Sequence, residues 1–138
     1  DKGGKGHTVG CCKFADGSGI SAQSFEHMAA RGIRQGPEHM INGFCCFKKG
    51  NHGISRPDGG YPALRPANAK EELPVTRDGI GDDMGIAINI HKGGYNTTSS
   101  LGCQTIYPPQ WDGFINLVYS EMTRYEQKTI PYLLVDNT

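Results

Sequence analysis

The residues of this chain that are best suited to chemistry are Cys103 and His91, which lie in the segment 85–106. A thiolate is a strong nucleophile, and a nearby imidazole is able to take the thiol proton while backbone N–H groups stabilise an oxyanion. Gly102 precedes the cysteine, and its missing side chain lets a substrate approach the backbone closely. One cysteine and one distant histidine are a weak signal by themselves, because a buried thiol and a surface imidazole explain the same residues.

Two short strands are expected to position this pair. Ile86, Ile88 and Ile90 alternate with smaller or polar residues, so a strand here buries the isoleucines on one face. The same alternation turns His91 to the other face, away from the core. Residues 104–106 follow the cysteine and begin the next strand.

The order of residues in this segment resembles the active-site signature of the L,D-transpeptidase catalytic domain: Ile-Asn-Ile-His, a short polar insert, then Ser-Leu-Gly-Cys. That family has a mostly β fold and acts on bacterial peptidoglycan through a cysteine nucleophile and a histidine base. The resemblance covers about residues 84 to 107. It implies that Cys103 is the nucleophile and His91 its base, and that Ser100, Gly102 and the backbone at Cys103 form the floor and the oxyanion site.

The segment departs from the family pattern around the cysteine. Its insert is shorter, Leu101 stands where a second histidine is often found, and Gln104 follows the cysteine where arginine or asparagine is common. A substrate carboxylate would then need another cation, and arginine binds carboxylates bidentately. Each arginine of the loop region taken singly is better explained as a solvated surface residue. The expected substrate-binding residues are Arg56, Arg65, Arg77, Asn89 and Gln104.

Length and composition indicate one domain, residues 1–138, of the mainly β or α+β class, with a mixed sheet and one long helix near the C-terminus. Twenty Gly and eight Pro favour a turn-rich β domain over a helix bundle. Fourteen basic and fourteen acidic residues give zero net charge, which offers no electrostatic case for nucleic acid or an anionic membrane. No stretch is apolar for long enough to predict membrane insertion.

Hydrophobic periodicity and turn residues place the remaining elements. We expect two helices, one irregular stretch and three strands joined by turns, and the prolines decide several of these elements. The expected elements of the first half are a strand at 7–14 with a turn at 16–19, a short helix at 21–31, and a strand at 40–47 ending in a turn at 48–51. An irregular stretch of turns and extended pieces follows at 52–79, with a turn at 81–83. The chain then forms a helix from 109 to 125 with an apolar stripe, and a final strand at 129–135 in which Pro131 indicates an edge or a bulge.

The five cysteines form two adjacent pairs, 11–12 and 45–46, and one single residue, Cys103. If the pairs bridge in disulfides, Cys103 is left as the reactive thiol. A zinc site is a weaker alternative, because adjacent cysteines on a strand point in opposite directions and do not converge on one metal. No cofactor is expected.

These observations predict a cysteine enzyme that acts on peptidoglycan stem peptides through a thioester, as a transpeptidase or as an L,D-carboxypeptidase or endopeptidase. No export leader opens the chain, so delivery to a periplasmic or extracellular site by a phage virion or as an injected effector is expected as readily as export. The alternative is a non-enzymatic, disulfide-braced β module of a phage virion or a secreted binding protein, with Cys103 in a disulfide.

Overall fold

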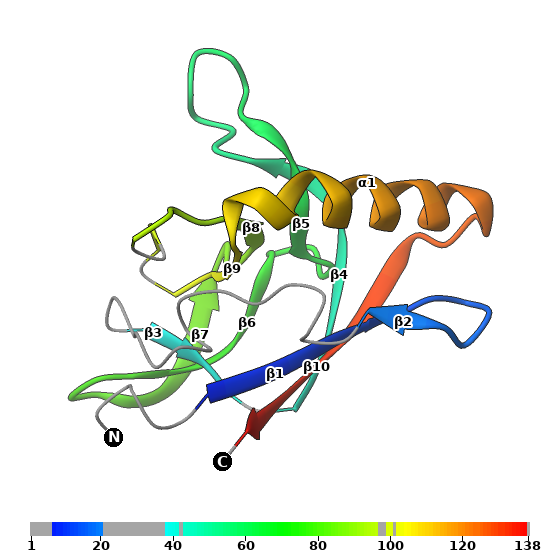
Figure 1. The fold of residues 1–138 in the computed structure, drawn as a ribbon. Helices are drawn as coiled ribbons and strands as arrows, with labels where there is room; N and C mark the ends of the chain where they lie inside the picture. Colours follow the sequence, from blue (N-terminus) through cyan, green and yellow to red (C-terminus); the bar gives the residue numbers. More distant parts are fainter. Residues whose placement is uncertain (1–6, 21–37, 42, 97–98, 101, 138) are drawn as a thin grey trace.

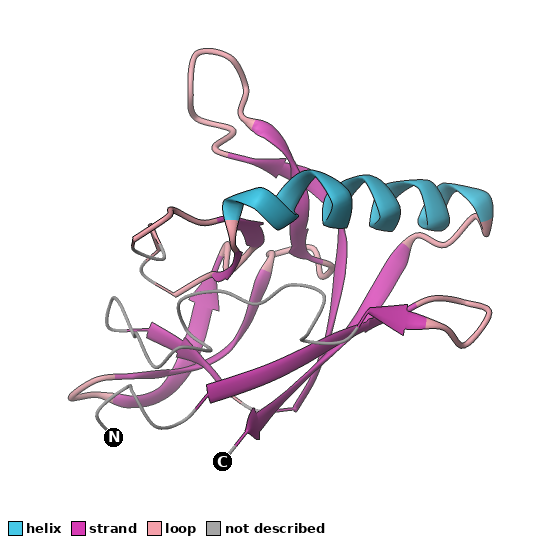
Figure 2. Cartoon of the chain, in the orientation of Figure 1, coloured by secondary structure: helices cyan, strands magenta, loops and turns pink. Residues whose placement is uncertain are grey.

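The computed structural model describes residues 7–20, 38–41, 43–96, 99–100 and 102–137. The helix expected at 21–31 lies outside these residues. The elements, shown in Figures 1 and 2, are β1 (His7–Lys13), β2 (Gly19–Ile20), β3 (Glu38–Met40), β4 (Gly43–His52), β5 (Tyr61–Pro66), β6 (Glu72–Arg77), β7 (Gly81–Ile86), β8 (Ile90–Lys92), β9 (Gln104–Ile106), α1 (Pro108–Arg124) and β10 (Thr129–Asn137).

The strands form two sheets. The larger has the order β2-β1-β10-β4-β5-β8-β9, and the smaller has the order β3-β6-β7. All pairs are antiparallel except β8 with β9, so the larger sheet is mixed. The prediction of a mainly β protein with a mixed sheet and one helix near its C-terminus is confirmed. Among the described residues, no helix is long and apolar enough to cross a membrane.

Helix α1 lies across the larger sheet, as Figure 1 shows. It starts at Pro108, where a missing N–H costs nothing, and the predicted apolar stripe faces the sheet. The Tyr119 hydroxyl donates to the Ala63 carbonyl in β5 (2.7 Å), and Lys49 Nζ in β4 donates to Thr123 Oγ1 (2.6 Å). These contacts fix the helix over β4 and β5. The buried stripe consists of Trp111, Phe114, Ile115, Val118 and Met122.

The stretch from 48 to 79 is more regular than expected. The expected turn at 48–51 is wrong, because β4 continues through these residues to His52 and pairs with β5 as far as His52 and Tyr61. The turns and extended pieces expected at 52–79 are ordered into two paired strands, β5 and β6. Pro62 and Pro66 are accommodated because they flank Leu64, the one residue of β5 that pairs with β8. Their missing N–H groups therefore break no ladder.

The final strand is central rather than an edge. β10 lies between β1 and β4, which contradicts the edge expected from Pro131. Pro131 pairs with Cys46 on the β4 side, whereas the pairing with β1 ends one residue later, at Tyr132 opposite Cys12. Pro131 thus lies just beyond the end of the ladder between β10 and β1, so its missing N–H removes no hydrogen bond from that ladder.

The disulfides expected from the cysteine pairs do not form among the described side chains. Cys12, Cys45, Cys46 and Cys103 are all thiols rather than half-cystines. The reason is topological, since β1 and β4 pair with opposite sides of β10. Strands separated by one strand lie about 10 Å apart, beyond the roughly 7 Å Cα separation that a disulfide tolerates.

Candidate functional site

The segment that carries the histidine is bent rather than one continuous strand. Ala87 has a left-handed backbone (φ 54°), which ends β7 and redirects the chain before β8 begins at Ile90. Its N–H donates to the Glu71 carbonyl (2.8 Å), which holds the bend. The expectation that Ile86 joins the buried face is therefore wrong, since its side chain is 69% exposed, whereas Ile88 and Ile90 are buried.

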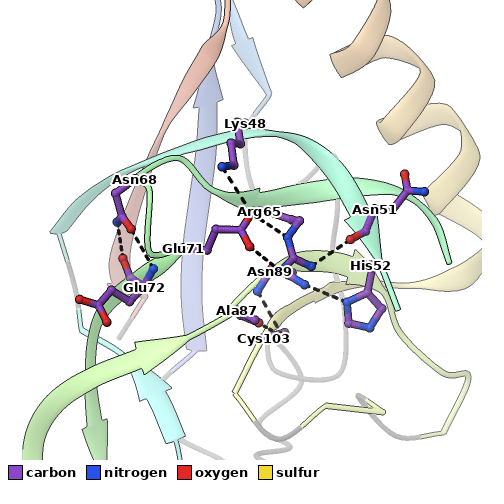
Figure 3. A network of polar contacts seen from close by, with 10 residues as sticks. All are labelled: Lys48, Asn51, His52, Arg65, Asn68, Glu71, Glu72, Ala87, Asn89 and Cys103. Carbon is purple, nitrogen blue, oxygen red and sulfur yellow. Dashed lines mark hydrogen bonds and ion pairs between the residues drawn. The ribbon is translucent and has the colours of Figure 1, made fainter. Parts of the chain in front are cut away.

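Parallel pairing of β8 with β9 brings the cysteine beside this bend. Ile90 pairs with Gln104, and the Gln104 N–H donates to the Asn89 carbonyl (2.9 Å). This register places Cys103 next to Asn89, whose own N–H donates to Cys103 Sγ (3.3 Å). The thiol in turn donates to the Ala87 carbonyl (3.5 Å). Two backbone groups of the bend thus hold the sulfur, as Figure 3 shows.

A pocket of about 510 Å³ opens over the cysteine. It brings together the four expected catalytic residues, Cys103, His91, Ser100 and Gly102, and it is completed by Glu38, His52, Ile86, Ala87 and Ser99. His91 faces away from Ile90, as the alternation predicts, but its side chain is only 3% exposed because the pocket walls enclose it. The turn to the other face therefore takes His91 into the wall of the pocket rather than out to solvent.

The hydrogen bond at His91 fixes its tautomer. Nδ1 lies 2.8 Å from the Lys92 carbonyl oxygen, which only accepts, so Nδ1 carries the proton. The basic nitrogen of the neutral ring is then Nε2. A backbone carbonyl that orients the imidazole in this way is an arrangement suited to a general base.

A second histidine, His52, completes the site and was missed by the sequence analysis. It ends β4 and stacks on His91 with a ring separation of 3.9 Å and an interplanar angle of 13°. The Asn89 side-chain amide lies 3.0 Å from His52 Nδ1, and the Tyr61 ring meets His52 edge-on at 5.7 Å. The sequence analysis left His52 in a loop because it expected a turn at 48–51, whereas β4 continues through these residues to His52.

The thiol is protonated in the resting site. Burial raises the pKa of Cys103, and the hydrogen bonds from Asn89 and Ser100 lower it less; Glu38 raises it and Arg65 lowers it through their charges. A raised thiol pKa leaves little thiolate at neutral pH. The cysteine therefore needs a base to become a nucleophile.

Ser100 and Gly102 shape the loop that carries the cysteine. The Ser100 hydroxyl donates to the Cys103 carbonyl (3.1 Å) and accepts from the Gly102 N–H (3.2 Å). The Gly102 N–H is therefore engaged within the loop, which leaves the backbone N–H of Cys103 as the candidate donor to an oxyanion. A Cβ at Gly102 would lie 2.9 Å from Glu38 Cβ and 3.2 Å from Ile88 Cδ1, so only glycine fits against β3.

The substitution Gly102→Ala is expected to displace the cysteine loop, because the Cβ and the backbone oxygen of Glu38, at 2.9 and 3.3 Å from the added Cβ, are held by β3 and do not move aside easily. We expect it to cost about 1–3 kcal/mol of unfolding free energy and to lower catalytic turnover by about tenfold or more. Chemical denaturation and a turnover assay measure the two effects. The matched control is Gly113→Ala on α1, where an added Cβ meets nothing within 4 Å. Wild-type turnover in Gly102→Ala would contradict the close packing.

The expected substrate-binding arginines do not line the pocket. Arg65 is buried and donates to both carboxylate oxygens of Glu71 (2.9 and 2.7 Å) and to the Asn51 carbonyl (2.9 Å), as Figure 3 shows. Arg77 binds Glu38 (2.6 Å) and Asp83, so it orients a pocket residue from behind. Arg56 lies exposed in the loop between β4 and β5.

The two other expected substrate-binding residues also lie outside the pocket lining. Asn89 is 2% exposed and bridges Cys103 to His52. Gln104 accepts a hydrogen bond from the Tyr132 hydroxyl through Oε1 (3.1 Å). The structure thus gives both residues contacts that position the site.

The substitution Arg65→Met is expected to destabilise the fold by about 1–3 kcal/mol, because Glu71 keeps only its ion pair with Lys48 (3.4 Å) and the Asn51 carbonyl loses its Arg65 donor. The Arg65 hydrogen bonds lower the pKa of Glu71, so this stabilisation is present above the unfolded carboxyl pKa and is lost as the pH falls through the folded value. Denaturation at several pH values should show the deficit shrinking below about pH 4. Exposed Arg56→Met serves as the control, with a change within about 0.5 kcal/mol. An equal loss in both variants would contradict the assignment.

The described residues contain no group of three or more His, Cys, Asp or Glu side chains that could hold a metal ion. Comparison of the chain with models of protein families, with curated proteins and with solved structures gives no match.

Proposed function

We propose that this protein is a cysteine-dependent, peptidoglycan-modifying enzyme of the L,D-transpeptidase type. The observation that carries the proposal is the pocket in which Cys103, His91, Ser100 and Gly102 meet. His91 lies before the segment that carries Ser100, Gly102 and Cys103, and the parallel pairing of β8 with β9 brings the two segments side by side. The volume of about 510 Å³ suits a short peptide segment.

The proposed reaction begins with proton transfer from the Cys103 thiol to His91 Nε2. The thiolate then attacks the carbonyl carbon of a stem-peptide bond, and the carbonyl oxygen becomes an oxyanion near the Cys103 N–H. Collapse of this intermediate breaks the C–N bond, and the departing amine takes the proton from His91. The product is a thioester on Cys103.

A second half-reaction releases the acyl group. An amine or water attacks the thioester carbonyl, His91 removes its proton, and the Cys103 sulfur leaves and is reprotonated. Attack by an amine gives transpeptidation, and attack by water gives carboxypeptidase or endopeptidase activity. The proposed site of action is periplasmic or extracellular, where the wall lies, with bacterial stem peptides as the partners and with delivery by export, a phage virion or a secretion system.

The substrate would be held without a pocket-lining arginine. Among the described residues that line the pocket, the one carboxylate is Glu38, and His52 and His91 are the titratable bases. Both hydrogen bonds from Arg77 to Glu38 go to Oε2, at 2.8 and 2.6 Å. Contacts to the substrate are therefore proposed to come from the pocket walls and the backbone rather than from Arg56, Arg65 or Arg77.

The test is incubation of purified peptidoglycan with the protein and with Cys103→Ala, followed by mass spectrometry of released and retained muropeptides. We expect cleavage or cross-link products with the wild type alone, and their masses identify the bond and the acceptor. Sacculi with different stem peptides should be included, under reducing conditions. Identical muropeptide profiles for both proteins across all sacculi would overturn the proposal and favour a non-enzymatic β module.

A further inference from the structure

His52 and His91 come together through three strands. His52 pairs with Tyr61 at the end of the β4–β5 ladder, and β5 pairs with β8 at Leu64 and Ile90. This register stacks the two imidazoles at 3.9 Å and 13°, which is van der Waals contact over the ring faces. Both rings line the pocket that contains Cys103.

The contacts of His52 hold its ring in one orientation. The Asn89 amide lies 3.0 Å from Nδ1, and Tyr61 packs edge-on against the ring at 5.7 Å. When the Asn89 amide donates, Nδ1 must present a lone pair, so His52 carries its proton on Nε2. Asn89 also donates its backbone N–H to Cys103 Sγ, and so the same residue fixes the nucleophile and this ring.

Two imidazolium rings cannot stack at this distance without strong repulsion, so one ring of the pair has to stay neutral. The surroundings select His52 for that role. Burial lowers the pKa of His52, and the positive charges of Arg56 and Arg65 lower it further. The other groups that face the pair are the neutral Tyr61 ring, the Cys103 thiol and the Glu38 carboxylate at the pocket wall.

We propose that His52 is a positioning residue for His91: its neutral ring holds the His91 imidazole in the plane in which Nε2 is able to take the Cys103 proton. His52 fixes the ring face while the Lys92 carbonyl fixes Nδ1. The imidazolium that forms on His91 then lies against a neutral π face, which is a favourable contact for a cation. This inference rests on the proposed role of His91 as the base of Cys103.

The experiment measures the alkylation rate of Cys103 by iodoacetamide against pH, read by mass spectrometry of the peptide that contains it. It needs no peptidoglycan, so it is independent of the proposed wall substrate. The variants are His91→Ala, His52→Phe, which keeps a flat ring, and His52→Gln, which keeps an acceptor but removes the ring. Circular dichroism and thermal melts confirm that each variant is folded, and Cys46, the exposed thiol, serves as an internal reference.

We expect alkylation of Cys103 at neutral pH to fall about tenfold in His52→Gln and at least as far in His91→Ala. His52→Phe should stay within about twofold of the wild type, since the stack is retained. A fall in His52→Phe as deep as in His91→Ala would make His52 a base and overturn the proposal. Unchanged alkylation in His52→Gln would also overturn it. If the His52 variants change alkylation as expected but the protein yields no muropeptide products, the proposed wall substrate is refuted and the role of His52 stands.

Discussion

Replacing Cys103 by serine is expected to abolish turnover of muropeptides, with a loss of about four orders of magnitude or more. Serine is slightly smaller than cysteine and still offers a group that can accept from the Asn89 N–H and donate to the Ala87 carbonyl, but its hydroxyl is a far weaker nucleophile than the thiolate. The measurement is product formation over time, together with intact-protein mass spectrometry for the thioester. We expect the acyl adduct on the wild type and its absence from Cys103→Ser.

The matched control for this loss is Cys46→Ser. Cys46 is an exposed thiol on β4, and it lies outside the pocket. Its replacement should leave turnover and adduct formation unchanged, because surface substitutions of this kind usually have little effect. An adduct that persists in Cys103→Ser, or that is lost in Cys46→Ser, would place the nucleophile elsewhere.

Replacing His91 by alanine should lower turnover at neutral pH by about 10²–10⁴-fold, the usual contribution of a general base. Burial raises the pKa of the Cys103 thiol, so without a base the reaction depends on spontaneous ionisation of that thiol. The fraction of thiolate grows as the pH rises toward the raised pKa. Turnover of His91→Ala should therefore climb steadily into the alkaline range, as the thiolate fraction of Cys103 grows.

Lys92→Ala is the control for the histidine. Lys92 is exposed, and what orients His91 is its backbone carbonyl, which alanine also provides. Turnover and its pH profile should match the wild type, apart from the loss of the lysine contact over the Tyr61 ring. If His91→Ala kept the turnover of the wild type at neutral pH, proton transfer would have to be assigned to another group of the pocket.

The arginines expected to bind substrate show what local sequence reasoning leaves undecided. An arginine is recognisable as a partner for carboxylates, but a sequence pattern does not show which carboxylate it meets. Arg65 meets Glu71 of its own chain, and Arg77 meets Glu38. Both ion pairs join residues on different strands or turns, so they depend on the completed sheets rather than on neighbouring residues. Arginines that are already paired with carboxylates of their own chain are less available to bind a substrate.

The cysteine pairs illustrate the same limit. Adjacent cysteines on two strands suggest a disulfide framework, but pairing requires that the strands be neighbours. β10, from the far end of the chain, inserts between β1 and β4 and separates them. The position of the last strand therefore keeps the cysteines of β1 from reaching those of β4.

The sequence by itself determined the elements whose signals are local. The paired prolines and the apolar stripe predicted α1, and alternation with turn residues predicted β1 and most of β10. The same local order of residues singled out Cys103, His91, Ser100 and Gly102, which the fold gathers in one pocket. Periodicity and caps are properties of a few consecutive residues, so a sequence displays them directly.

Only the tertiary structure decided how these residues are supported. The left-handed bend at Ala87 turned an expected strand into two, and the β4–β5–β8 register brought His52 onto His91. Asn89 came to bridge Cys103 and His52. Each of these outcomes follows from strand pairing between distant segments, where a shift of one residue would turn every side chain to the other face. That register is a property of the whole sheet, and so no single stretch of sequence contains it.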